Sequence, residues 1–135
     1  VCVDGSSDRT PEIARERGTA VRFGGLYGPG RVGVERYLGD TTVKAGHLNL
    51  IRGVDAASAL LAADEGDDDL YVAVDDKPVD RHELARWMSD STGRPHGKLV
   101  GETRSPNKRC SNEHLRSTGW KPTYPTYREG YAPLL

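Results

Sequence analysis

The fold is decided by a strand-like run that breaks into a glycine-rich loop, Val21-Arg22-Phe23-Gly24-Gly25-Leu26-Tyr27-Gly28-Pro29-Gly30-Arg31. The apolar start is typical of a β-strand, and the glycines and the proline after it do not continue such a strand. Glycine lets the main chain come close to a ligand, and loops at strand ends often carry binding residues. We therefore predict a binding site at this loop, with a purely structural turn as the alternative.

The spacing of the loop argues against the common phosphate-binding motifs. Its glycines read Gly-Gly-x-x-Gly-x-Gly, whereas the dinucleotide fingerprint is G-x-G-x-x-G leading straight into a helix, and Pro29 interrupts the pattern. No Gly-Lys-Ser/Thr follows, so the loop is not a P-loop. The residue four positions after Tyr27 is Arg31, so a Tyr-x-x-x-Lys catalytic pair is absent here. The loop is therefore expected to approach a cofactor ring or a substrate.

The elements around the loop alternate in the manner of an α/β protein. The segment 54–63 is predicted to be a helix by its strong helix propensity, and it is small and apolar on almost every side, so we expect it to be buried against a sheet. Residues 94–107 are polar, contain two prolines and predict a loop. Capping patterns begin helices at Asp80 and Thr126. Strands are expected over 19–23, 41–44, 48–51 and 70–74, and helices over 10–18, 32–38, 54–63, 80–93, 111–119 and 127–135.

The length, composition and net charge argue against several classes of protein. The chain of 135 residues has 19 basic and 20 acidic residues, so its net charge of −1 argues against a nucleic-acid partner. No apolar run approaches 18 residues, which argues against a membrane span. The four histidines show no metal-ligand spacing, and the acidic run over 64–69 reads as a solvated loop. Cys2 and Cys110 read as two unpaired thiols in a reducing, cytoplasmic setting.

Three charged residues near the loop are candidates for binding or chemistry. Arg31 and Arg36 follow the glycines, and a guanidinium holds two oxygens of a phosphate or a carboxylate at once. A solvated or salt-bridged arginine is the alternative for each. Asp55 lies in the first turn of a predicted helix, where the helix dipole favours a carboxylate. Its role is therefore open between capping and catalysis.

Four segments in order resemble the C-terminal half of an extended short-chain dehydrogenase/reductase, of the NAD-dependent epimerase/dehydratase kind. The quoted loop is similar to that family's strand ending in Tyr-Gly-Pro-Gly, and residues 48–57 are similar to its Ile-His-x-x-Asp-Ala segment. Residues 71–79 resemble its strand before a helix, and 108–130 resemble its closing region. The resemblance covers residues 20–135, and Arg52 stands where the family often has histidine.

The resemblance implies an α/β fold: the C-terminal part of a Rossmann-type parallel sheet plus a small α+β substrate-binding region. Residues 1–38 and 48–75 would end the Rossmann-type core, and 76–135 would form the substrate-binding region. The resemblance also implies NAD or NADP as cofactor and a small-molecule or nucleotide-sugar substrate. It places Phe23, Gly24, Gly25 and Leu26 near the nicotinamide, and with the arginine chemistry above it assigns substrate contacts to Tyr27, Arg31, Arg36 and Arg52.

The departures from the family limit what the chain is expected to do by itself. The glycine-rich fingerprint and the Tyr-x-x-x-Lys pair are missing from these 135 residues, so we assign no catalytic residue and expect little or no activity from this chain alone. The chain begins at Val1 without Met, which suggests a fragment of a longer product, for which a homodimer is an option. The rival interpretation is a non-catalytic fragment or degenerate domain that binds a nucleotide or a protein partner.

Overall fold

The computed structural model describes residues 2–3, 18–103 and 107–135 of the chain. The predicted helix over 10–18 and the side chain of Cys2 therefore lie outside the described residues. The strands are β1 Cys2–Val3, β2 Ala20–Phe23, β3 Gly25–Tyr27, β4 Thr42–Ala45, β5 His47–Leu48, β6 Leu50–Arg52, β7 Leu70–Ala73, β8 Val79–Asp80 and β9 Lys98–Thr103. The helices are η1 Val34–Arg36, α2 Gly53–Glu65, α3 Arg81–Thr92, α4 Glu113–Arg116, α5 Tyr127–Tyr131 and η2 Ala132–Leu134.

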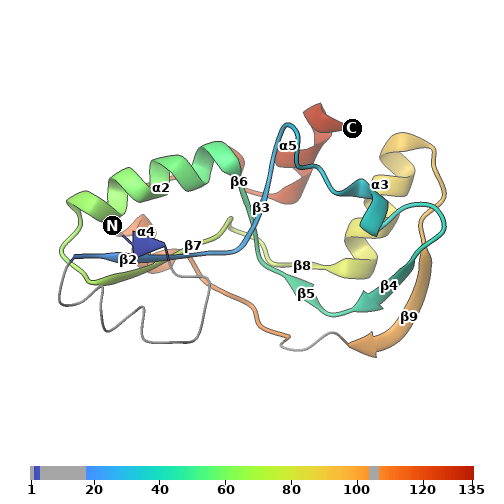
Figure 1. Cartoon of the computed structure of the whole chain (residues 1–135), viewed down its shortest axis with the longest axis horizontal. Helices are drawn as coiled ribbons and strands as arrows, with labels where there is room; N and C mark the ends of the chain where they lie inside the picture. The colour runs from blue at the N-terminus through green and yellow to red at the C-terminus, as the bar shows by residue number, and fades with distance from the viewer. Residues whose placement is uncertain (1, 4–17, 104–106) are drawn as a thin grey trace.

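One half of the fold is built on parallel strands. They run in the order β1-β2-β7, with Val21 opposite Tyr71 and Phe23 opposite Ala73. Figure 1 shows α2 running beside β2 and β7, with α4 close to the same strands. The core between these elements contains small residues of α2 together with larger side chains of the strands and of the α4 region. The predicted mixed α/β class with a parallel sheet is confirmed.

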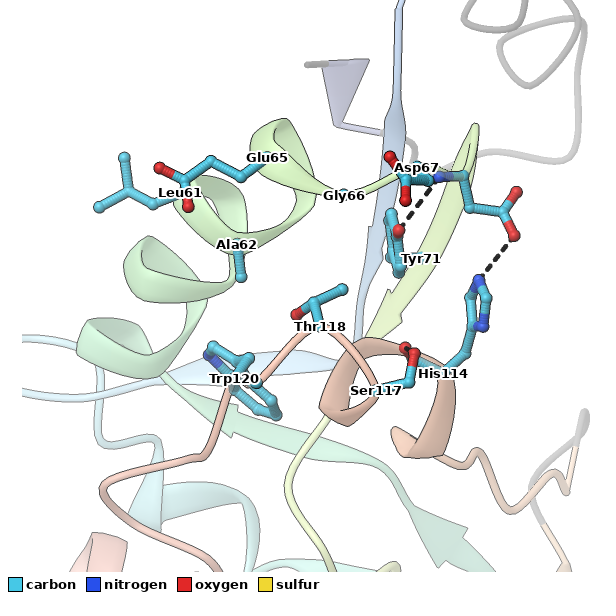
Figure 2. Close-up of a pocket in the computed structure, with 12 residues that line it drawn as sticks. Leu61, Ala62, Glu65, Gly66, Asp67, Tyr71, His114, Ser117, Thr118 and Trp120 are labelled. Atoms are coloured by element: carbon cyan, nitrogen blue, oxygen red, sulfur yellow. Dashed lines mark hydrogen bonds and ion pairs between the residues drawn. The ribbon is translucent and has the colours of Figure 1, made fainter.

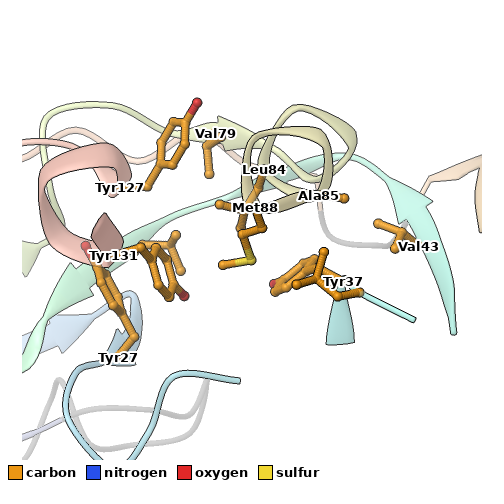
Figure 3. Close-up of a cluster of buried hydrophobic side chains, with 11 residues drawn as sticks. Tyr27, Tyr37, Val43, Val79, Leu84, Ala85, Met88, Tyr127 and Tyr131 are labelled. Carbon is orange, nitrogen blue, oxygen red and sulfur yellow. The ribbon is translucent and has the colours of Figure 1, made fainter. Parts of the chain in front are cut away.

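The other half holds β4 and β9, which pair in parallel, and β5 and β8, which pair antiparallel. Asp80 begins α3 by accepting hydrogen bonds from the main-chain N–H groups of His82 and Glu83, as predicted, and Gly93 ends the helix at φ +73°. A second apolar cluster forms between α3, α5 and the strands (Figure 3). Its labelled members are Tyr27, Tyr37, Val43, Val79, Leu84, Ala85, Met88, Tyr127 and Tyr131.

One local prediction is wrong, and helix α2, which packs against the sheet as predicted, is more exposed on its outer face than expected. Lys98–Thr103 is a strand, not part of a polar loop, because its main chain pairs in parallel with β4 although most of its side chains are exposed. Helix α2 buries only one face, with Ala56, Ala59 and Ala63 inside, while Leu61 is 73% exposed and Val54 is 57% exposed. A helix on the edge of a small sheet has only one neighbouring layer, so its outward side chains stay in contact with solvent.

The last residues of the chain pack near the strands β3 and β6. Thr126 and Glu129 form the predicted capping box at the start of α5, and η2 follows directly. Figure 1 shows α5 beside β3 and β6, which are far from it in sequence. The C-terminal strap, defined here as residues 123–131, therefore lies against the strands that follow the glycine loop. The predicted division of the chain at residue 76 stays a prediction.

Candidate functional site

The carboxyl ends of parallel strands meet at the glycine loop. The N–H of Gly24 donates to the carbonyl of Ala73 at 3.1 Å, and the N–H of Gly25 donates to the carbonyl of Asn49 at 2.7 Å. A Cβ on Gly24 would overlap the main chain of Asn49, so only glycine fits there. In open parallel sheets ligands bind outside the carboxyl ends of the strands. The loop therefore crosses the sheet at the edge where α/β proteins bind ligands.

Asn49 ties this edge to the segment before α4. Its side-chain amide donates to the carbonyl of Lys108 at 2.9 Å, and its side-chain oxygen accepts from the N–H of Cys110 at 2.7 Å. One side chain thus satisfies two main-chain groups about 60 residues away. Asn112 extends the connection by donating to the carbonyl of Val74 at 2.9 Å. These hydrogen bonds hold the segment before α4 against the carboxyl edge of the sheet.

An apolar hollow of about 400 Å³ lies between the glycine loop and α2. Four of the predicted site residues line it, namely Phe23, Leu26, Tyr27 and Arg31. Leu26 is 41% exposed, and the Nε of Arg31 donates to the carbonyl of Leu26 at 3.2 Å. The guanidinium of Arg31 thus folds back on its own loop. A hollow with so few polar groups suits a flat ring more than a charged group.

Arg52 and Asp55 hold the C-terminal strap. Arg52 is 8% exposed, donates through Nη1 to the carbonyl of Gly130 at 2.5 Å, and lies over the ring of Tyr124 at 4.3 Å from the ring centre. Asp55 is 1% exposed and accepts the N–H groups of Thr123 and Tyr124 at 2.7 and 2.9 Å. Asp55 therefore caps a distant loop rather than its own helix, and both charges are used inside the fold.

Tyr27 and Asp75 are buried polar groups beneath the same strap. The Tyr27 ring stacks on Tyr131 with ring centres 4.0 Å apart, and its hydroxyl is buried without a hydrogen-bond partner in the described part of the chain. Burial, with the nearby Asp75 charge, raises the pKa of the Tyr27 phenol well above its usual range. Burial also raises the pKa of the Asp75 carboxyl to about 7. A phenol held this firmly in its neutral form is a poor proton donor at neutral pH.

A second hollow, of about 460 Å³, is basic. It lies between the segment after the glycine loop, β4 and the start of α3, and Arg36, Lys44 and Arg81 contribute its cations. Tyr37, Thr41 and Thr42 add polar groups to its wall. Cations and hydroxyls from separate elements suit an anion such as a phosphate or a carboxylate. Lys44 also forms a 3.0 Å ion pair with Glu102 at the rim.

A third hollow, of about 690 Å³, lies elsewhere and includes none of the predicted site residues. It opens between the end of α2, the loop before β7 and α4 (Figure 2). His114 contacts Asp68 there at 2.7 Å and stacks on Tyr71. This hollow is at the amino end of β7, opposite the edge that carries the glycine loop. Among the described residues, no three His, Cys, Asp or Glu side chains gather in a way that could hold a metal ion.

The structure separates the predicted site residues into four groups. Phe23, Leu26, Tyr27 and Arg31 share the apolar hollow, Arg36 lines the basic hollow, and Arg52 is buried under the strap. Gly24 and Gly25 are bonded to neighbouring strand ends. Sequence reasoning missed Lys44 and Arg81, because only the fold brings them beside Arg36. It also missed Asp75, whose burial no local pattern indicates.

The described residues fit only one end of a dinucleotide. Phe23 and Leu26 offer an apolar wall beside the exposed main chain of the glycine loop. The part of the chain that the structure describes has no glycine-rich turn of the fingerprint type leading from a strand into a helix. None of the described helices is both long and apolar enough to cross a bilayer.

Comparison with known proteins gives structural matches only. No protein-family model matches the chain, and no curated protein matches it in sequence. A conserved protein of unknown function from Silicibacter pomeroyi is 26% identical with a TM-score of 0.71, over 86% of this chain and 47% of that one. A putative NAD-dependent epimerase/dehydratase from Methylobacillus flagellatus is 25% identical with a TM-score of 0.65, over 97% and 52%.

A third match extends the same fold. The UDP-glucose 4-epimerase of Thermus thermophilus, solved with NAD, is 19% identical with a TM-score of 0.68, over 85% of this chain and 44% of that one. At this identity the likeness shows the fold alone. The chain spans about half the length of the structures it matches. The resemblance to epimerase/dehydratase and short-chain dehydrogenase/reductase proteins, predicted from the sequence, is confirmed in structure.

Proposed function

We propose that this chain is the C-terminal portion of an NAD(P)-dependent oxidoreductase or epimerase that acts on a carbonyl or alcohol carbon. The observation that carries the proposal is the glycine loop at the carboxyl edge of the sheet, where Gly24 packs on Asn49 and the apolar hollow opens beside Phe23 and Leu26. The structural matches to NAD-dependent epimerases and dehydratases support it. When bound, the cofactor would supply the hydride acceptor, and this chain would supply one wall of the site.

The substrate that the chemistry favours is an anionic small molecule of the nucleotide-sugar class. The basic hollow supports this, because Arg36, Lys44 and Arg81 line it with three cations, and guanidinium and ammonium groups bind phosphate oxygens. The apolar hollow and the basic hollow are reached from the two ends of residues 23–36. In this arrangement Phe23 to Leu26 would lie along the nicotinamide ring, and Arg36 would bind the charged end of the substrate.

A titration of the 135-residue chain tests the substrate half of the proposal. UDP-glucose should shift the backbone NMR signals of Arg36, Thr42 and Lys44 with a dissociation constant of roughly 1 mM, the affinity expected for half a site. Glucose, which lacks the diphosphate, is the matched control and should shift none of them. Equal shifts with both ligands, or none with UDP-glucose at roughly 10 mM, would contradict the proposal.

The reading frame upstream of Val1 tests the enzyme half. An in-frame G-x-x-G-x-x-G followed by Tyr-x-x-x-Lys would supply the pyrophosphate cradle and the proton donor that these 135 residues lack. The longer product should then either reduce NAD or NADP in the presence of a sugar nucleotide, followed by absorbance near 340 nm, or interconvert sugar nucleotides without net reduction of the cofactor, followed by NMR of the sugar. A frame that starts near Val1 would instead favour the non-catalytic alternative.

That alternative, a domain that binds a nucleotide or a protein partner without turnover, has one observation in its favour. The Tyr27 hydroxyl and the Arg52 guanidinium, both predicted at the substrate, are enclosed by the C-terminal strap. Side chains used in this way stabilise the fold and do not reach a substrate while the strap is docked. Ligand binding by the full-length product, with neither net reduction of the cofactor nor conversion of the sugar nucleotide, would support this second candidate.

A further inference from the structure

The Asp75 carboxyl is unusually placed for an acid. It follows β7 directly, is 2% exposed, and accepts one hydrogen bond through Oδ1, from the N–H of Lys77 at 3.0 Å. Its Oδ2 is buried without a hydrogen-bond partner among the described residues. A buried carboxylate with an unsatisfied oxygen is more unfavourable than the neutral acid, because burying a charged group costs more than burying a neutral one. The position therefore favours the protonated form.

The groups around Asp75 reinforce that preference. On its own loop Asp76 adds negative charge, and Glu129 of α5 and Asp55 of α2 do the same from other elements. Together with burial, which is the largest cause, they raise the pKa of Asp75 to about 7, while the bond from Lys77 N–H lowers it. The charged and titratable groups facing this region are Tyr27, Arg52, Asp55, Asp76, Lys77, Cys110, Glu113, Arg116, Glu129 and Tyr131.

The C-terminal strap covers this acid. The N–H of Asp76, the next residue, donates to the carbonyl of Pro125 at 2.9 Å. The Tyr131 ring lies on the Tyr27 ring, and the Tyr27 hydroxyl is in direct contact with Gly130, where a Cβ would overlap it. A negative charge on Asp75 would therefore have to be solvated, either by loosening the strap or from the hollow of about 360 Å³ that Asp75 lines together with residues 110–113 and Arg116.

We propose that Asp75 is a proton-operated latch for the C-terminal strap. The neutral carboxyl keeps the strap docked on the strand ends. When its proton passes to solvent, the carboxylate draws water beneath the strap and weakens the contacts of Tyr131 with Tyr27 and of Gly130 with Arg52. The Arg52 guanidinium is then released toward the carboxyl edge of the sheet, so the latch would control how much positive charge that edge presents.

Amide hydrogen exchange followed by NMR tests the latch on the whole chain. After correction for the intrinsic rate, the protection of the Thr123, Tyr124 and Gly130 amides should fall at least tenfold, and up to about 70-fold, between pH 5 and 7.5. Asp75→Asn, which mimics the neutral acid, should hold protection constant over this range. Asp90→Asn, an exposed acid on α3, is the matched control and should behave like the wild type.

Two outcomes would overturn the latch. One is a strap whose protection does not change with pH, or changes equally in Asp75→Asn. The other is identical protection, at every pH, of the strap amides and of ladder amides such as Val21, because that result describes unfolding of the whole chain. If Asp75→Asn fails to fold, the ¹³C carboxyl signal of wild-type Asp75 gives the answer. Titration near pH 7 supports the latch, and titration near pH 4 overturns it.

Discussion

Gly24 and the main-chain carbonyl of Asn49 lie in direct contact, so closely that a Cβ on residue 24 would overlap the oxygen. This contact brings the loop after β2 down onto the start of β6 and sets the position of Phe23 and Leu26 beside α2. The glycine is thus required by packing between main chains, and the opening beside it follows from that packing.

Gly24→Ala should lower the free energy of unfolding by about 2 kcal/mol or more, because the added methyl group meets main chain that has no rotamer to adjust. Urea unfolding followed by tryptophan fluorescence measures this. Gly101→Ala in β9 is the control, because no atom of the described residues lies within 4 Å of its Cβ position, and it should change stability by less than about 0.5 kcal/mol. Equal effects at both positions would contradict the contact.

Asp55→Asn should destabilise the fold by about 2 kcal/mol. The carboxylate accepts two main-chain N–H groups, and an amide side chain offers only one oxygen to replace it. Asp64→Asn on the same helix is exposed and should be nearly neutral. Chemical denaturation of the three proteins side by side measures the difference. A neutral Asp55→Asn would show that its bonds to Thr123 and Tyr124 contribute little.

Tyr27→Phe should be stabilising by about 1 kcal/mol, since it removes a buried hydroxyl that has no hydrogen-bond partner in the part of the chain that the structure describes, and it keeps the ring on Tyr131. Tyr71→Phe should act in the opposite direction, because the Tyr71 hydroxyl accepts a bond from the N–H of Asp68 at 3.1 Å. Thermal unfolding midpoints give both signs. A destabilised Tyr27→Phe would indicate that its hydroxyl is satisfied in solution.

Stability should fall by about 2 to 3 kcal/mol as the pH rises from 5 to 7.5. The pKa of Asp75 is about 7 in the fold and 3.8 as the ordinary value, so the folded chain holds a proton that the unfolded chain releases. The stabilisation is complete below pH 3.8 and is lost as the pH rises toward 7. Urea midpoints across this range measure it.

Acids whose pKa is lowered in the folded state have the opposite effect on stability, which they increase as the pH rises. Hydrogen bonds from Tyr127 and Lys77 lower the pKa of Glu83, and bonds from Arg116 and Asn112 lower that of Asp76 despite its partial burial. Their contribution is lost in acid, below about pH 4, so stability should peak near pH 5. A stability that rises steadily from pH 5 to 7.5 would contradict the role of Asp75.

Arg36→Gln should weaken the binding of UDP-glucose by roughly fivefold, the effect of about 1 kcal/mol, because one of three cations in the basic hollow is lost. Arg86→Gln changes the same charge on the exposed face of α3, outside the hollow, and should leave affinity unchanged. An NMR titration of both variants compares them. Equal weakening would indicate a general charge effect instead of a site.

Patterns among neighbouring residues were enough to predict much of the fold. The caps at Asp80 and Thr126 were predictable because a capping pattern depends on only three or four adjacent residues. Strand β9 was not, because Lys98–Thr103 is polar and contains a glycine, and only pairing with β4 holds it extended. The exposed face of α2 was missed for a similar reason, since the number of layers beside a helix is a property of the whole fold.

The candidate site also contains some features that neighbouring residues predict and others that only the fold brings together. The glycine loop was predicted from its own residues, and the structure places it at the carboxyl edge of the sheet. The basic hollow combines residues from three separate segments, of which only Arg36 stood out in the sequence. The roles of Arg52 and Asp55 depend on partners between 68 and 78 residues away, which no local pattern indicates.

These long separations in sequence also determine the order in which contacts can form during synthesis. Arg52 emerges from the ribosome well before Gly130, its partner 78 residues later, so the strand ends must wait for almost the whole chain before their charges are satisfied. Until then Arg52 and Asp55 stay in water, and the apolar ring of Tyr27 lacks its cover. A ribosome-bound chain that ends before residue 123 should therefore be a target for chaperones, and completing the strap would mark the moment at which the domain no longer needs them.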